Sequence, residues 1–321
     1  MKDPFFLEPI PSLSRAVQPF ADYFDLPTLP YHIHEILAAA LLYGVIYYPI
    51  SPILSRLVVP NHYGKLSRKS QLNWDTHVVS MVQSVLINAL AIWVMIYDEE
   101  RKSMDLEERV WGYTGAAGLV QSLAAGYFLW DLIVTGLHVD VFGLGTLAHA
   151  IAALIVYMLG FRPFVNYYGC IFILWELSTP FLNIHWFLDK LNMTGTRLQL
   201  YNGILLLGSF FFARLVYGTY QSVRVFGDIV QTMDRHPSQD KFESPLMLYA
   251  HDASTVPVWL GAAYLASNLT LNFLNFYWFN KMIAAIRKRF EPAAKRDTKP
   301  AAVVSASSGT SKGSTPRRRK A

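Results

Sequence analysis

The sequence predicts an all-α, polytopic membrane protein, built as a transmembrane helical bundle. Hydrophobic residues make up 53% of the 321 residues and charged residues only 16%. The mean hydropathy is +0.25, and together these values lie outside the range of ordinary soluble domains. Apolar stretches of about 20 residues, long enough to cross a bilayer, recur between polar loops. No loop between them exceeds about forty residues, so we expect no hidden soluble catalytic domain.

The apolar stretches are about seven in number. They lie at residues 32–50, 76–97, 112–137, 143–160, 163–188, 197–220 and 257–281. We expect the fifth to be broken near Pro180, because proline lacks the backbone N–H that a continuous helix needs. Residues 1–31 lack the continuous apolar core of a cleavable signal peptide, so the first stretch should direct insertion by itself.

These stretches divide the chain into four parts. We expect an N-terminal lumenal segment at 1–31, a first transmembrane helix with a basic cytosolic loop at 32–69, a main transmembrane domain at 70–285, and a basic tail at 286–321. The tail is rich in Ala, Ser, Pro and Lys and should be disordered in the cytosol. Its basic end, with Arg318 and Arg319, is a retrieval signal in one interpretation and a solvated tail in the interpretation that we favour.

The charged loops indicate an orientation for the bundle. The first loop carries four basic residues, and the C-terminal segment is dense in Lys and Arg, whereas the second loop, "YDEERKSMDLEERVW", is mostly acidic. Because cytosolic loops carry an excess of basic residues, the first loop and the C-terminus are expected in the cytosol. Seven alternating spans then place the N-terminus in the lumen or outside.

Some classes of site are absent from the sequence. The single cysteine, Cys170, excludes an intramolecular disulfide and a cysteine-based zinc site. We found no phosphate-binding glycine loop, no metal-binding cluster and no nucleic-acid module. We therefore expect no metal, no cofactor and no nucleic-acid partner. The net charge of +5 comes largely from the segments assigned to the cytosol and suits an anionic membrane surface.

Ionisable side chains inside the predicted spans are candidate functional residues, because burying them in lipid is costly. Asp131 and His149 each lie nine residues from the hairpin tip at Asp140, on opposite sides of it. They should therefore stand at matching depth and could be neighbours. Glu176 falls in the same cytosolic half of the membrane, counted at about 1.5 Å per residue. Amide side chains of three other spans reach similar levels: Gln83, Asn202, Asn272 and Asn275.

Polar groups from six spans thus gather in one half of the membrane, whereas simple helix–helix hydrogen bonds would be spread over both leaflets. We interpret the gathering as a polar-lined cavity open toward the cytosol, and interhelical packing contacts are the alternative. A kink at Pro180 should turn Glu176 and Asn183 toward the interior, with Glu176 as the floor of the site. The predicted ligand-binding residues are Glu176, Asn183, Gln83, Asn202 and Asn275.

Two other polar features have simpler interpretations. Arg214, toward the lumenal end of the sixth span, is expected to extend to the interface as an anchor, and contact with a lipid headgroup is the alternative. His32 and Glu35 open the first span, and their i, i+3 spacing permits an approach. Placement at the membrane interface alone also accounts for them.

Four stretches of the sequence resemble the TLC domain, which is shared by TRAM proteins and ceramide synthases. They are "LNWDTHVVSMVQSVL" at 72–86, "GYFLWDL" at 126–132, "WELSTPFLNIHWFLDK" at 175–190 and "LYNGILLLGSFFFARLVYG" at 200–218. Their order and spacing fit the family over residues 70–280, and the third and fourth stretches are the specific ones. The resemblance implies an all-helical domain of the endoplasmic reticulum membrane, tied to lipid sensing, trafficking or synthesis.

The ceramide synthase branch of this family transfers an acyl chain from acyl-CoA to a sphingoid amine, using adjacent histidines and downstream aspartates. In the matching stretch "LAHAIAAL", His149 is present, but Ala150 stands in place of the second histidine. The paired acidic motif is replaced by the stretch around Glu176. Where many members carry Arg and His, this chain has His77 and Gln83. The sequence is therefore more similar to the TLC-domain-containing proteins that are not synthases.

We therefore expect a multi-pass protein of the endoplasmic reticulum that binds lipid, affects lipid homeostasis and is not an enzyme. Its partners should be membrane lipids, namely a sphingolipid, a phospholipid or an acyl chain, and a homo-oligomer is left open. The first alternative is an acyl-CoA-dependent N-acyltransferase for sphingoid bases, with acyl-CoA as substrate and a catalytic pair of His149 and Asp131. The second is a trafficking or cargo receptor whose cytosolic tail carries the signal.

Overall fold

The computed structural model describes residues 1–250 and 254–290. Within them the fold is all helical, and pairing of β type is limited to one isolated bridge between Met233 and Val256. Each predicted span corresponds to helix. The helices that carry the spans are α2 (Leu29–Val45), α5 (Arg68–Tyr97), α8 (Gly115–Leu137), α10 (Leu144–Leu159), α12 (Thr179–Lys190), α13 (Arg197–Phe210) and α15 (Val258–Phe290). The predicted all-α bundle is confirmed.

Shorter helices connect or extend these elements. Those outside the bundle core are α1 (Pro11–Phe24), α4 (Pro60–Tyr63), α6 (Glu99–Lys102), α7 (Leu106–Trp111) and α9 (Val139–Phe142), with the short 3-10 helices η4 (Gln239–Glu243) and η5 (Pro245–Met247). Those that continue a span are α3 (Ser51–Val58), α11 (Asn166–Phe172) and α14 (Gly218–Thr232).

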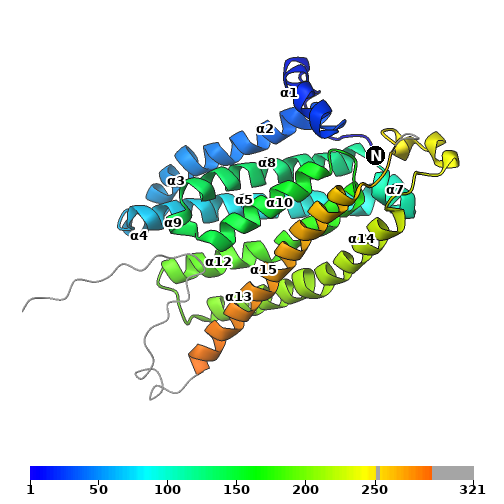
Figure 1. The fold of residues 1–321 in the computed structure, drawn as a ribbon. Helices are drawn as coiled ribbons and strands as arrows, with labels where there is room; N and C mark the ends of the chain where they lie inside the picture. Colours follow the sequence, from blue (N-terminus) through cyan, green and yellow to red (C-terminus); the bar gives the residue numbers. More distant parts are fainter. Residues whose placement is uncertain (251–253, 291–321) are drawn as a thin grey trace, which may run out of the picture.

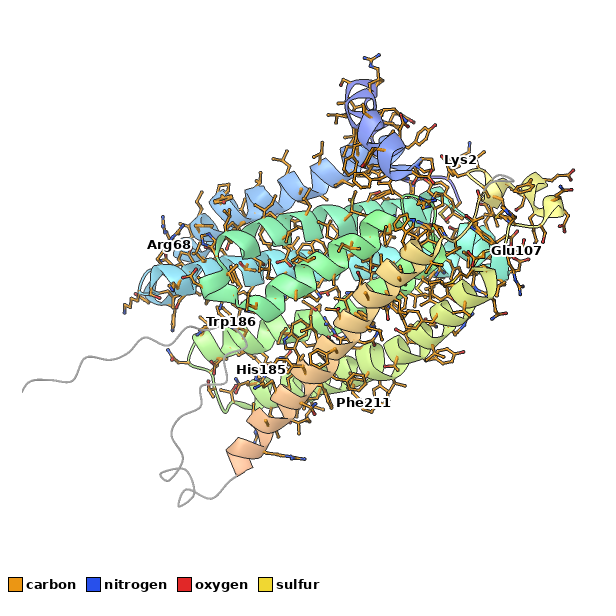
Figure 2. All side chains as sticks on the ribbon, in the orientation of Figure 1. Lys2, Arg68, Glu107, His185, Trp186 and Phe211 are labelled. Atoms are coloured by element: carbon orange, nitrogen blue, oxygen red, sulfur yellow. The ribbon has the colours of Figure 1, made fainter. Side chains whose placement is uncertain are left out.

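The long helices lie side by side along one axis, and α15 crosses them obliquely (Figure 1). One end of the bundle carries α4, α9 and the C-terminal end of α15, and we call it the α4 end. The other carries α7 and the N-terminus, and we call it the α7 end. Arg68 lies at the α4 end, whereas Lys2 and Glu107 lie at the α7 end (Figure 2). The basic first loop and the end of α15 thus share one end, as the predicted orientation requires.

The apolar surface of the bundle fits a membrane. Five helical segments of the described chain are long and apolar enough to span one: Leu29–Val58, Arg68–Tyr97, Leu106–Leu137, Asn166–Lys190 and Arg197–Thr232. The apolar α10 is shorter, at 16 residues. Large apolar side chains from several of these helices are exposed on the outside, among them Leu41, Leu57, Ile133, Leu137, Phe212 and Val223. Such a surface would be unfavourable in water and is expected against lipid.

Several helices begin at residues whose side chains cap them. The side chain of Ser67 precedes α5 and accepts a hydrogen bond from the Ser70 backbone N–H at 3.4 Å. Thr114 and Thr196 cap α8 and α13 in the same way. Asp105 and Glu108 form a reciprocal capping box at the start of α7. Each cap satisfies a backbone donor that the first helical turn leaves unpaired.

The central helix is α8, which packs against α2, α5, α10 and α11. Its buried face is lined with small residues, including Ala117, Ala124, Ala125 and Gly126. Small side chains allow two helix backbones to approach closely, which is the usual way that helices associate in membranes. A Cβ atom placed at Gly126 would lie 2.4 Å from the carbonyl oxygen of Ile36, so α2 and α8 are in backbone contact there.

Three spans contain irregular segments. The first carries a π-helix, η1 (Ile46–Ile50), which contains Pro49. The fifth changes from α11 through a 3-10 helix, η2 (Ile173–Ser178), into α12. Pro180 lies in the first turn of α12, where its missing N–H has no intrahelical partner to lose. The predicted break in this span is therefore present, but it is a change of helix type just before Pro180. The sixth span carries a second π-helix, η3 (Phe211–Tyr217).

The two ends of the chain differ in part from the predicted division. The N-terminal segment contains α1, which was not predicted, and its side chains Phe20, Tyr23 and Phe24 are exposed. At the other end, α15 continues to Phe290, so the first residues of the tail predicted from 286 are helical. Residues 291–321 lie outside the described residues, and their disorder and the retrieval signal stay predictions.

Candidate functional site

A buried ion pair lies in the bundle interior, between Glu176 and Arg214. One guanidinium nitrogen of Arg214 lies 3.4 Å from Glu176 Oε1 and also donates to Thr179 Oγ1 at 3.1 Å. The other guanidinium nitrogens donate to Asn275 Oδ1 at 3.0 Å and to Ser178 Oγ at 3.2 Å. Both charged side chains are almost fully buried, as are their three partners. The pair therefore holds η2, η3, α12 and α15 together.

The irregular helices place these two charges. Glu176 is on the 3-10 helix η2, and Arg214 is on the π-helix η3, and the two segments are in contact. A π-helix displaces side chains from the positions that an α-helix would give them, and such segments are frequent at functional sites. Phe211, at the start of η3, lies on the outer face of the bundle (Figure 2). The same short segment thus presents an apolar residue outward and Arg214 inward.

A small cavity lies beside Glu176. Its volume is about 20 Å³, which is room for about one water molecule. The lining includes His149, Glu176 and Asn268 among apolar and aromatic side chains, with contributions from α8, α10, α11, η2 and α15. The bundle is thus closed in this conformation, and the predicted cavity is present here only as a water-sized space.

Two hydrogen-bond donors at this site have no partner among the residues that the structure describes. Asn275 accepts from Arg214 through its oxygen, but its amide nitrogen is buried without an acceptor, and so is the indole nitrogen of Trp175. A buried unpaired donor costs about 1–3 kcal/mol. Native proteins usually satisfy such groups with water or a ligand. The Asn275 amide therefore offers a free donor next to the Arg214 guanidinium, whereas the Trp175 indole nitrogen lies against Gly218.

The predicted pair of His149 and Asp131 has a different arrangement. Both side chains come within electrostatic range of Glu176, which agrees with the matching depth expected from the sequence. Asp131, however, accepts a hydrogen bond from Thr135 at 3.2 Å. The His149 ring lies 5.6 Å from the Trp278 ring and 5.9 Å from that of Phe128, between centroids. Among the described residues, no hydrogen bond to a carboxylate orients His149.

The remaining predicted ligand-binding residues lie apart from the ion pair. Asn183 bonds to His77 Nδ1 at 2.7 Å and to Ser80 at 3.1 Å, joining α12 to α5. The His77 ring also stacks on Trp186, with centroids 4.1 Å apart. Asn202 donates to the Phe181 carbonyl oxygen at 2.8 Å. These contacts are of the interhelical kind that the sequence left as the alternative.

Gln83 is a different case. Its side chain is fully buried, and within residues 1–250 and 254–290 neither its amide nitrogen nor its amide oxygen has a hydrogen-bond partner. Of the predicted set, the structure therefore brings together Glu176 and Asn275, with His149 on the same cavity as Glu176. Asn183 and Asn202 belong to helix contacts.

The anchoring role predicted for Arg214 is wrong. Its side chain is 6% exposed and bonds to Glu176, Ser178, Thr179 and Asn275 instead of extending to the interface. Counting residues gives the depth of Arg214 but not the direction in which its side chain points, and the π-helix changes that direction. The signal available in the sequence was the need of the buried Glu176 for a cation, since unpaired charges are not stable in a bilayer.

Comparisons with known proteins give the family context. A family model described as the TLC domain matches residues 73–284. An uncharacterised TLC domain-containing protein of Schizosaccharomyces pombe is 40% identical over 278 residues, which are 87% of each chain. The topoisomerase I damage affected protein 4 of Saccharomyces cerevisiae is 29% identical over 269 residues, covering 82% of this chain and 87% of that protein. Human TLC domain-containing protein 4 is 29% identical over 204 residues, covering 59% of this chain and 75% of that protein.

Proposed function

Since the chain belongs to the TLC-domain family, and to its members that are not ceramide synthases, we propose that it is a lipid-binding membrane protein. The observation that carries this proposal is the guanidinium of Arg214, buried in an apolar bundle beside unpaired hydrogen-bond donors. The ligand enters with its polar group at Arg214 and Asn275 and with its acyl chain along the apolar and aromatic lining near His149. The predicted ligand-binding role of Glu176 and Asn275 is kept on this basis.

The chemistry of the site favours a head that accepts hydrogen bonds. Arg214 and Asn275 present N–H donors, whereas Glu176 already accepts bonds from Thr179 and Arg214. A carboxylate, an amide carbonyl or a hydroxyl of a fatty acid or sphingoid lipid would fit this pattern. A space of about 20 Å³ cannot hold an acyl chain. Binding therefore requires α15 to move, because α15 supplies Asn268, Leu271 and Asn275 to this region.

The proposed setting is the endoplasmic reticulum membrane, with the C-terminus in the cytosol and a role in lipid homeostasis. The basic first loop and the end of α15 at the α4 end support this orientation. Protease treatment of sealed microsomes that contain a C-terminally tagged protein tests it. If the tag is protected from protease until the membrane is dissolved, the C-terminus is not in the cytosol and the proposed orientation is wrong.

Lipid binding can be measured with photoactivatable lipids. We expect the purified protein in lipid nanodiscs to crosslink to a photoactivatable fatty acid or sphingosine, and Arg214→Gln to reduce labelling about tenfold or more, because a charge-assisted hydrogen bond is worth about 1.5–3 kcal/mol. Peptide mapping should place the label on η2, α10 or α15. The cavity-filling Ala153→Met should reduce labelling without touching the ion pair, because Ala153 lines the cavity.

Arg162→Gln is the matched control, because Arg162 pairs with the exposed Asp25 at 2.7 Å on the surface. It should label like the unsubstituted protein. Equal labelling of all variants, or a label found only on outer residues such as Phe212, would reject a lipid site at Arg214. The labelling of Asp131→Asn shows the effect of changing a buried carboxyl group outside the ion pair, since Asp131 is bonded to Thr135 and not to Arg214.

A second candidate function is acyl-CoA-dependent N-acylation of a sphingoid base. It is favoured by one observation, that His149 and Glu176 line the same cavity. His149 would take the proton from the attacking amine, and the thiolate of CoA would leave. Purified protein with radiolabelled acyl-CoA and a sphingoid base should then form product, and His149→Ala should abolish it. Absence of turnover across chain lengths removes this candidate and leaves lipid binding standing.

A further inference from the structure

A second polar cluster lies at the α7 end, away from Glu176. It consists of Asp3, from the segment that precedes α1, and His32 and Glu35 on α2. His32 Nδ1 lies 2.8 Å from Glu35 Oε2 and 3.5 Å from Asp3 Oδ2. One ligand atom from each side chain lies within 4.8 Å of the other two. The approach of His32 to Glu35 that their spacing permitted is thus present, and Asp3 joins it from 29 residues away in the chain.

The cluster is built into the fold. His32 and Glu35 are 1% and 0% exposed, whereas the Asp3 side chain is 31% exposed. His32 Nε2 is held by the hydroxyl of Tyr113 at 2.5 Å. Gly118 makes this contact possible, because a Cβ atom there would lie 2.6 Å from His32 Nε2. The ring is therefore fixed by its Nε2 atom, and its Nδ1 atom faces the two carboxyl groups.

The charges of the cluster are not balanced by the protein. Two carboxyl groups meet at one imidazole nitrogen, and among the described residues neither forms an ion pair with Lys or Arg. Glu35 Oε1 is buried without a hydrogen-bond partner in the part of the chain that the structure describes, and His34 Nε2 lies 3.7 Å from it. A bound cation would remove this imbalance.

We propose that Asp3, His32 and Glu35 bind a divalent transition-metal ion, with zinc as the best match. The ligands would be Asp3 Oδ2, His32 Nδ1 and Glu35 Oε2, a nitrogen and oxygen set that zinc commonly accepts. Tyr113 then acts as the partner of the second imidazole nitrogen, the arrangement that fixes most metal-binding histidines. The exposed side of Asp3 is the route of entry. The ion would fasten the N-terminal segment to α2.

The test uses the full chain in lipid nanodiscs, first treated with a chelator and then titrated with zinc chloride. We expect about one zinc ion per chain by elemental mass spectrometry and a rise in melting temperature on zinc addition. Asp3→Asn should weaken zinc binding at least tenfold. Asp3 is partly exposed and bonds few groups, so this variant should still fold. Its matched control is Asp25→Asn, an exposed aspartate near the same end of the bundle, which should bind zinc normally.

Tyr113→Phe tests the positioning of His32. It should weaken zinc binding less than Asp3→Asn, while Gly118→Ala should weaken it by displacing the ring. In a parallel titration, manganese chloride should compete with zinc for the same ligands. Manganese binding should also be weakened by Asp3→Asn. No zinc above the level retained by Asp3→Asn, or equal binding by both aspartate variants, would overturn the proposal. Hydrogen exchange of residues 1–7, slower with zinc than without, is an independent readout.

Discussion

Substitution of Arg214 by Met is expected to lower the free energy of unfolding by about 3–5 kcal/mol, because it leaves Glu176 charged and unpaired in an apolar interior. Glu176→Gln should have an effect of similar size, since it leaves the buried guanidinium without its counter-ion. The measurement is the melting temperature and denaturant midpoint of the purified protein in one detergent. Both variants should have a melting temperature and a denaturant midpoint well below those of the unsubstituted protein.

The double variant Glu176→Gln, Arg214→Met makes this prediction specific. Removal of both charges leaves no unpaired ion, so the loss should be smaller than the sum of the single losses by about 1–3 kcal/mol. Arg162→Met is the matched control, because its ion pair with Asp25 is at the surface and should be worth about 0–1 kcal/mol. If Arg214→Met is no more destabilising than Arg162→Met, the ion pair is not formed in the interior.

The same comparison separates stability from lipid binding. Lipid that occupies the site through Arg214 would stabilise the unsubstituted protein by mass action and leave Arg214→Met unaffected. Added fatty acid should therefore raise the melting temperature of the Arg162→Met control and not that of Arg214→Met. A buried ion pair costs desolvation free energy that an apolar pair would avoid, and a ligand site would give a reason for its presence.

The sequence predicted the fold well because hydropathy and helix length follow directly from the bilayer. Each apolar stretch found by counting is helical in the structure, and the break near Pro180 is present. The helix α1 was missed, because it contains Pro19 and is too short to span a bilayer, although Val17, Phe20 and Phe24 recur at helical spacing. Its stability depends on α2, against which it packs.

Counting residues predicts how deep each side chain of the candidate site lies in the membrane, but not the direction in which it points. Glu176, His149 and Asp131 were placed at one level by counting, and the structure brings His149 and Asp131 into electrostatic range of Glu176. Arg214 was misjudged, because the hydrogen-bond pattern of a π-helix cannot be read from "FFARLVY". The contact of Asp3 with His32 could not be foreseen either, since it depends on how a segment without regular structure returns over the bundle end.

Irregular helices make room for one polar cluster in this apolar chain, and a glycine makes room for the other. In the interior, η2 and η3 direct two opposite charges toward each other, and α15 closes over them. At the α7 end, the absence of a side chain at Gly118 admits the His32 ring against Tyr113. In each case a departure from close α-helical packing makes room for groups that a regular bundle would exclude. The two clusters are therefore independent, and substitutions at one should not affect the readout of the other.

Gly126→Ala is expected to destabilise the bundle by about 1–3 kcal/mol or more, because it overpacks a backbone contact. The new methyl group would lie 2.4 Å from the carbonyl oxygen of Ile36 and 2.7 Å from the Cβ atom of Ala39. These are backbone and short side-chain atoms that cannot rotate away, so α2 must move from α8. A lower melting temperature and faster exchange of α2 amides are the measurements.

Gly136→Ala, on the same helix, should stabilise the bundle instead of destabilising it. Nothing lies within 4 Å of a Cβ atom at Gly136, and alanine is favoured over glycine inside a helix by about 1 kcal/mol. Because both substitutions change the same helix in the same chemical way, their difference measures the contact between α2 and α8 without the contribution of helix propensity. Equal melting temperatures for the two variants would mean that α2 does not approach α8 at Gly126. The placement of His32 and Glu35 beside Tyr113 would then lose its support as well, because α2 carries both side chains.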